Sequence, residues 1–106
     1  MDIARDNEGY LLDPSQWSEQ LAAVIAAEEN IDLSDDHWHI IRFIRSHYET
    51  SQVVAETRAL LKHLKQTMDA EKATRKYVYQ LFPYGYGQQA CKIAGMRKPL
   101  KLMLDV

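Results

Sequence analysis

The stretch Ser34-Asp-Asp-His-Trp-His-Ile-Ile-Arg-Phe-Ile-Arg-Ser-His-Tyr48 combines a helix start with an apolar stripe, and it indicates a mainly helical chain. Ser34 is a preferred N-cap residue, and Asp35 and Asp36 place two acids at the positive end of the helix dipole. The side chains of the stripe recur at helical spacing on one face: Trp38, Ile41, Ile44, Arg45 and Tyr48. We therefore expect an amphipathic helix here.

A second helix is predicted before this stretch, and a third after it. Asp13 is the expected N-cap of the earlier helix and Pro14 its first residue, followed by an apolar face of Trp17, Leu21, Val24 and Ile25. Residues 49–52 are polar enough to form a turn. Beyond them, Val53 to Met68 repeats apolar side chains with a 3.6-residue period, which predicts a helix.

Two shorter helices are predicted in the last third of the chain. Asp69 is expected to cap one that ends before Pro83, because a residue that precedes proline is disfavoured in helical geometry. Residues 88–94 predict the other, and Gly95 is expected to end it in a left-handed conformation.

The two ends of the chain are expected to be non-helical. The polar turn Asp6-Asn-Glu-Gly9 lies between two short β-compatible segments and predicts a hairpin over residues 1–12. Residues 96–106 contain Pro99 and no helix cap, so we expect an extended arm. The predicted fold is a single, mainly α domain over residues 1–106: a small orthogonal helical bundle (13–95) with a helix-turn-helix, a short N-terminal β-hairpin and an extended C-terminal arm.

Charge and cysteine content limit the classes of function. The 106 residues include 13 Lys and Arg against 15 Asp and Glu, a net charge of −2, which argues against nucleic-acid binding through charge alone. The basic side chains Lys92, Arg97, Lys98 and Lys101 gather near the end of the chain, so an anionic partner is expected to bind there. With one cysteine and no long apolar run, we expect a cytoplasmic protein without membrane contact or an internal disulfide.

Cys91 is the candidate reactive residue, and two interpretations of it stay open at this point. It lies at the start of the short predicted helix, next to Lys92, where free amides and positive charge would favour a nucleophilic thiolate. Arg97 and Lys98 would add to this effect if the chain folds back. Alternatively, Cys91 packs as a small hydrophobic side chain, as cysteine commonly does.

Three other patterns are weaker. Tyr84-Gly-Tyr-Gly87 lacks the spacing and lysine of a phosphate-binding loop and is expected to be a structural turn. His37 and His39 do not face each other on a helix, so we predict no metal site and no cofactor. The basic side chains of the third helix, Arg58, Lys62 and Lys65, lie near one face and leave DNA binding through a helix-turn-helix as an alternative.

Three stretches together resemble the DsrC/TusE family of small sulfur-trafficking proteins. They are Asp6-Asn-Glu-Gly-Tyr-Leu-Leu-Asp-Pro-Ser-Gln-Trp-Ser18, then 33–45, and finally Tyr79-Gln-Leu-Phe-Pro83 continuing to Gln89-Ala-Cys-Lys-Ile-Ala-Gly95. The resemblance implies a helical fold with an N-terminal hairpin, a helix-turn-helix and a C-terminal arm that carries sulfur. It also implies partner proteins of the sulfur-relay or sulfite-reductase type.

The sequence departs from the family where the sulfur is carried. The resemblance implies a penultimate cysteine as the residue that accepts persulfide sulfur, and its place here, eleven residues after Cys91, is taken by Leu102. Cys91 matches a second family cysteine, and Arg97 replaces a proline that usually precedes Lys98-Pro99.

We therefore predict a sulfur-relay protein in which Cys91 is the only possible sulfur carrier, with Lys92, Arg97, Lys98 and Lys101 as binding residues. The alternative is a non-catalytic binding or regulatory member of the family that lacks sulfur transfer. Whether the chain has enzymatic activity of its own, and its oligomeric state, stay open.

Overall fold

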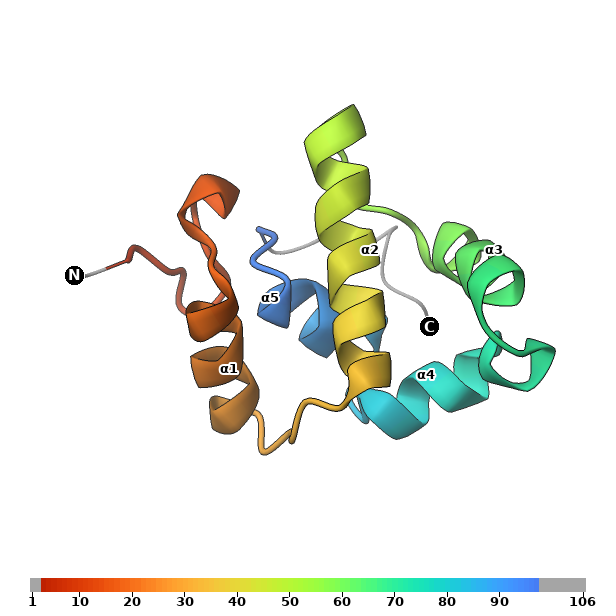
Figure 1. Cartoon of the computed structure of the whole chain (residues 1–106). Coiled ribbons are helices and arrows are strands. Elements are labelled where there is room, and N and C mark those ends of the chain that lie inside the picture. Colours follow the sequence, from red (N-terminus) through yellow and green to blue (C-terminus); the bar gives the residue numbers. More distant parts are fainter. Residues whose placement is uncertain (1–2, 98–106) are drawn as a thin grey trace.

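The computed structural model describes residues 3–97, and this part of the chain is helical (Figure 1). The α-helices are α1 (Glu19–Glu28), α2 (Asp35–Ser51), α3 (Thr57–Thr67), α4 (Arg75–Leu81) and α5 (Cys91–Ile93). Three short elements lie between them: the 3₁₀ turns η1 (Pro14–Gln16) and η2 (Ala70–Lys72), and the π-helix η3 (Tyr86–Ala90). Helix α2 runs between α1 and α3, and α5 packs against both α1 and α2. None of the described helices combines the length and the apolar character needed to cross a membrane.

Helix α2 begins at the predicted cap. Ser34 Oγ accepts from the His37 backbone N–H, and His37 Nδ1 accepts from the Ser34 N–H at 3.0 Å, so the two residues form a capping box. Because Nδ1 is an acceptor, the proton of the neutral imidazole lies on Nε2, which donates to the carbonyl of Leu81 at 2.8 Å. His37 therefore joins the start of α2 to the end of α4.

The helix predicted to start at Asp13 is divided in two. Asp13 caps only the three-residue turn η1, and Ser18 is the N-cap of α1, accepting from the Leu21 N–H at 3.1 Å. The backbone of Trp17 between them is extended, with φ −69° and ψ 148°. Its indole donates to the carbonyl of Ile93 at 2.8 Å, so a tertiary contact interrupts the helix.

The N-terminal hairpin prediction is wrong for the described residues, which contain no strand. The turn forms as expected, with Asp6 Oδ1 accepting from the N–H groups of Glu8 and Tyr10, but it is flanked by one isolated antiparallel bridge, Arg5 with Leu11. Tyr10 and Leu11 are both buried although they are consecutive, which a two-stranded ribbon with alternating faces does not allow. Contacts with the rest of the protein also hold this segment: Arg5 pairs with Glu28 of α1 at 2.7 Å, and the Tyr10 hydroxyl donates to the carbonyl of Gly87 at 3.4 Å.

Two further boundaries differ from the prediction. The polar residues 49–51 are the last turn of α2, which ends at Gln52 in a left-handed conformation (φ 63°), and α3 starts only at Thr57. Asp69 precedes the turn η2, whereas α4 is capped by the Thr74 side chain. The fold between α2 and α3 is thus a long helix, a five-residue connection (52–56) and a second helix, and nothing in it identifies a DNA-reading pair.

One core joins all five helices. Its large members come from α1, α2, α3, α4 and the segment around Cys91: Ile25, Ile40, Ile41, Ile44, Leu60, Leu64, Val78, Phe82, Ile93 and Met96. Met96, the predicted first residue of the extended arm, is fully buried in this core, whereas Arg97 is exposed. Residues 98–106, including Lys98, Pro99, Lys101 and Leu102, lie outside the described part of the chain.

A junction of three residues attaches the C-terminal segment to the core. The Arg45 guanidinium stacks on the Trp17 ring, 4.7 Å from its centroid, and its Nη1 donates to the carbonyls of Pro14 and Ala94, each at 3.1 Å. Gly95 ends α5 in the predicted left-handed region (φ +77°), and a Cβ there would lie 2.4 Å from Trp17 Cδ1. Only glycine fits both the backbone angle and the space above the indole.

Replacing Gly95 with alanine tests this junction, with Gly85→Ala as the matched control. Both glycines have positive φ, but a Cβ at Gly85 meets Tyr79 at an ordinary 3.5 Å. Both variants carry backbone strain, which is larger at Gly85, because φ 100° with ψ 165° is a conformation reached almost only by glycine, whereas only Gly95→Ala adds a clash with the indole. We expect Gly95→Ala to lose about 2–4 kcal/mol of unfolding free energy, at least as much as Gly85→Ala, measured by urea denaturation. A loss at Gly95 well below that at Gly85 would contradict the contact with the indole.

Candidate functional site

Cys91 lies where a π-helix passes into α5. Helix η3 occupies the five residues before it, and the Cys91 N–H donates to the carbonyl of Tyr86. The amide at Cys91 is thus used inside the helical segment, and the prediction of a free, positively polarised helix start at this residue is wrong. π-Turns are rare and occur often at functional sites, which makes this segment the first candidate.

The Cys91 side chain is completely buried, with an exposed fraction of 0%. Burial disfavours the charged form and raises the pKa of the thiol to about 12; contact with the Tyr86 hydroxyl acts in the opposite direction but is the smaller effect. At neutral pH the side chain is a thiol. Of the two interpretations of Cys91 from the sequence, packing in the core is confirmed and the helix-start thiolate is not.

Tyr86 contacts the buried Cys91 side chain. The ring is buried, and its hydroxyl donates to the carbonyl of Ala55 in the connection between α2 and α3, at 2.5 Å. Burial, followed by contact with Cys91, raises the pKa of this phenol well above its usual value. The hydrogen bond fastens the start of η3 to the residues that lead into α3.

Lys92 does not point its charge at the thiol. Its ammonium donates to Glu29 Oε2 at 2.9 Å, and it lies 5.7 Å from the centroid of the Tyr10 ring. The other oxygen of Glu29 accepts from Gln89 Nε2 at 3.2 Å, while Gln89 Oε1 accepts from the Tyr84 N–H at 2.9 Å. Glu29, at the end of α1, thus holds residues on both sides of Cys91 in place.

The other predicted binding residues separate into two groups. Arg97 is exposed and lies just beyond the buried Met96. Lys98 and Lys101 belong to the part of the chain that the structure does not describe. Of the two predicted binding residues in the described part, Lys92 is bonded to Glu29 and Arg97 is exposed.

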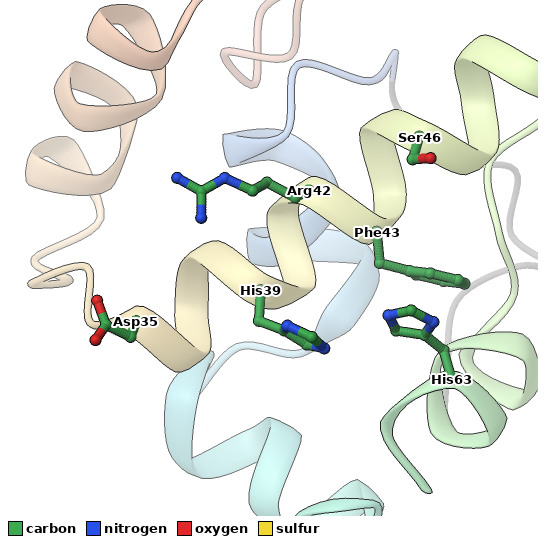
Figure 2. Close-up of a pocket in the computed structure, with 6 residues that line it drawn as sticks. All are labelled: Asp35, His39, Arg42, Phe43, Ser46 and His63. Atoms are coloured by element: carbon green, nitrogen blue, oxygen red, sulfur yellow. The ribbon is translucent and has the colours of Figure 1, made fainter. Parts of the chain in front are cut away.

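A shallow pocket of about 290 Å³ lies elsewhere, between α2 and α3 (Figure 2). The residues that line it are Asp35, His39, Arg42, Phe43, Ser46 and His63, none of which belongs to the segment around Cys91. The rings of His39, Phe43 and His63 lie close together, whereas Arg42 extends to the other side of α2. Among residues 3–97, no group of three or more His, Cys, Asp or Glu side chains is arranged to hold a metal ion.

Sequence reasoning missed Glu29, Gln89 and Tyr86. Glu29 and Lys92 are separated by 63 positions, and no local pattern signals their ion pair. No local pattern signals the π-helix, and Tyr84-Gly-Tyr-Gly87 predicts only a turn.

Comparison with known proteins places this geometry in context. The family model described as "DsrC like protein" matches residues 1–103. Sulfurtransferase TusE of Escherichia coli K12 is 46% identical over 100 residues, covering 94% of this chain and 92% of that protein.

Solved structures agree in fold. The solution structure of Allochromatium vinosum DsrC is 42% identical with a TM-score of 0.82, covering 92% of this chain and 88% of that one. The crystal structure of the oxidized gamma subunit of dissimilatory sulfite reductase (DsrC) from Archaeoglobus fulgidus is 34% identical with a TM-score of 0.84, covering 92% and 90%.

The ion pair between Glu29 and Lys92 can be tested by a double-mutant cycle with Glu29→Gln and Lys92→Met. Both side chains are largely buried, 19% and 12% exposed, so each single change leaves the other charge poorly compensated. We expect a coupling free energy of about 1–2 kcal/mol, from urea denaturation of the four proteins.

The control cycle uses Glu19 and Arg42, whose ion pair is 3.7 Å long and more than 60% exposed on both sides. Its coupling should be below about 1 kcal/mol. If both cycles give the same small value, Glu29 does not hold the segment around Cys91.

Proposed function

The chain belongs to the DsrC-like protein family, and from this premise we propose that it acts in sulfur trafficking as a protein-binding member whose own thiol stays covered. The observation that carries the proposal is the complete burial of Cys91, the single cysteine of the sequence. Sulfur relay requires a thiolate that a donor can reach, and release through a disulfide requires a second sulfur. In the folded protein a donor cannot reach Cys91, and the sequence contains no second cysteine.

The partners are proteins of the sulfur-relay or sulfite-reductase type. The names of the relatives support this assignment, since they include sulfurtransferases and a sulfite-reductase subunit. Arg97, exposed at the end of the described chain, and Lys98 and Lys101 beyond it are the basic side chains proposed to contact an acidic face of such a partner. Leu102, at the position where the family resemblance places the sulfur-carrying cysteine, supplies an apolar contact there in place of a thiol.

A second candidate function is sulfur carriage by Cys91 itself after residues 86–96 have opened. The π-helix that leads into Cys91 favours it, because such turns mark functional sites. The exposed thiolate would attack the outer sulfur of a donor persulfide, so that Cys91 gains one sulfur atom and the donor leaves as a thiol. This route requires an opening step that the first proposal does not need.

Loading with a small-molecule persulfide separates the two candidates. The folded wild-type chain is incubated with glutathione persulfide and examined by intact-protein mass spectrometry, beside Leu102→Cys as the matched positive control. We expect the mass of one added sulfur atom on Leu102→Cys and none on the wild type over the same time. Loading of Cys91 at a similar rate would contradict the proposal and establish the second candidate.

Binding is tested by competition. Leu102→Cys is loaded from a protein persulfide donor of the sulfur relay, with and without an excess of Cys91→Ser, which has no thiol. We expect the excess to slow loading several-fold, because the two chains share one binding surface. Cys91→Ser that also carries Arg97→Glu serves as the control and should compete less. No effect of either competitor would show that the chain does not bind that donor.

A further inference from the structure

Aromatic rings form a column between α2 and α3, and three of them, His39, Phe43 and His63, line the pocket in Figure 2. His63 of α3 stacks on His39 with ring centroids 5.2 Å apart and on Phe43 with centroids 4.5 Å apart. His47, one turn further along α2, contacts Phe43 at 5.8 Å. Three of the four rings are imidazoles, and they lie beside the apolar core contacts of α3, which include Leu60 and Leu64.

The hydrogen bonds fix the neutral form of His39. The Thr67 hydroxyl donates its single proton to the carbonyl of His63 at 2.8 Å. The same oxygen lies 2.9 Å from His39 Nε2, and it is therefore an acceptor there, with His39 as the donor. In the neutral state Nδ1 of His39 therefore carries no proton.

Charged residues lie near the column on α2 and on the elements packed against it. On α2, Asp36 interacts electrostatically with His39, but its carboxylate is already engaged by Tyr77 of α4 and by Lys72 of η2. The α2 residues Asp35 and Arg42 line the pocket with the column.

On α3, His63 is the residue that lines the pocket, and the exposed Lys62 and Lys65 do not. None of the described carboxylates acts on His63 as Asp36 acts on His39.

We propose that the His39–His63–Phe43 stack is a pH-sensitive latch that adds to the core packing of α3 on α2 while His63 is neutral and weakens this contact when His63 takes up a proton. Protonation would place a charge on a partly buried ring between His39 and Phe43, and movement of α3 away from α2 would return that charge to water.

The sign of the pH dependence follows from His63. Burial, and then the charge of His39, lower its pKa below the ordinary value of 6.5. The unfolded chain thus binds this proton more readily than the folded chain. The stability contributed by the neutral ring is fully present above the ordinary pKa and is lost as the pH falls through it towards the folded pKa.

Movement of α3 would disturb residues that bury Cys91. Ala55, two residues before α3, accepts the hydrogen bond from Tyr86, and Leu60 and Leu64 of α3 are fully buried in the core that contains Cys91. Movement of α3 would strain this hydrogen bond and open the packing around the thiol. This last step concerns the same buried thiol as the proposed function, whereas the latch itself does not depend on that function.

The test compares wild type with His63→Phe, which keeps a ring between His39 and Phe43 but cannot titrate. Urea midpoints are measured at about pH 7.5 and about pH 5.5. We expect the midpoint of the wild type to fall more on acidification than that of His63→Phe. The control His47→Phe, at the end of the column, should behave as the wild type does. An equal fall in wild type and His63→Phe would overturn the latch.

Two further measurements on the same proteins complete the test. An NMR titration of the wild type should show that the His63 ring takes up its proton at a lower pH than an exposed histidine does. This measurement does not require any variant to fold. Protonation of His63 at the ordinary pH would overturn the latch. The protection of Cys91 is the rate of its reaction with 4,4′-dithiodipyridine in the urea-unfolded chain divided by the rate in the folded protein at the same pH. Protection should fall several-fold more in acid for wild type than for His63→Phe, and an equal change would overturn the link to Cys91.

Discussion

The contact between Gly95 and the Trp17 indole is the constraint on which the rest of the structure depends. The backbone of residue 95 lies so close to the indole that no side chain fits between them, and Arg45 covers the other side of the junction while bonding to the carbonyls of Pro14 and Ala94. The first and last parts of the described chain are thereby joined across α2. Because Cys91 lies only four residues before Gly95, closing this junction also places the thiol inside the core.

The chemistry of Cys91 follows from this placement. A sulfur with no exposed surface and a pKa near 12 is a packed side chain at neutral pH, whatever its sequence context. Glu29 and Ala55 hold the segment from two sides through Lys92 and Tyr86. The relatives of this chain include sulfurtransferases, but its single thiol is buried. This favours a role in sulfur trafficking through binding.

Local signals predicted the parts of the fold that depend on local physics. The Ser34 cap, the helices on either side of it and the left-handed Gly95 are set by neighbouring residues, and all are present. The errors lie where a distant contact decides the conformation. Trp17 has an extended backbone and bonds to Ile93, and the pairing near the N-terminus is limited to one isolated bridge, beside which Arg5 bonds to Glu28 of α1.

The candidate site shows the same division. Cys91 was identifiable from its motif, but its burial, the ion pair of Lys92 and the π-helix before it depend on residues more than thirty positions away or on backbone geometry that composition does not encode.

Cys91 is buried in the folded protein and should be accessible only when the residues around it open. The most direct measurement is the rate of its reaction with a thiol reagent at neutral pH across a series of urea concentrations below the unfolding transition. We expect the reaction rate of Cys91 in native buffer to be at least about a hundredfold below that of the unfolded chain, and to rise with urea as the residues around Cys91 open. A native rate close to that of the unfolded chain, independent of urea, would contradict it.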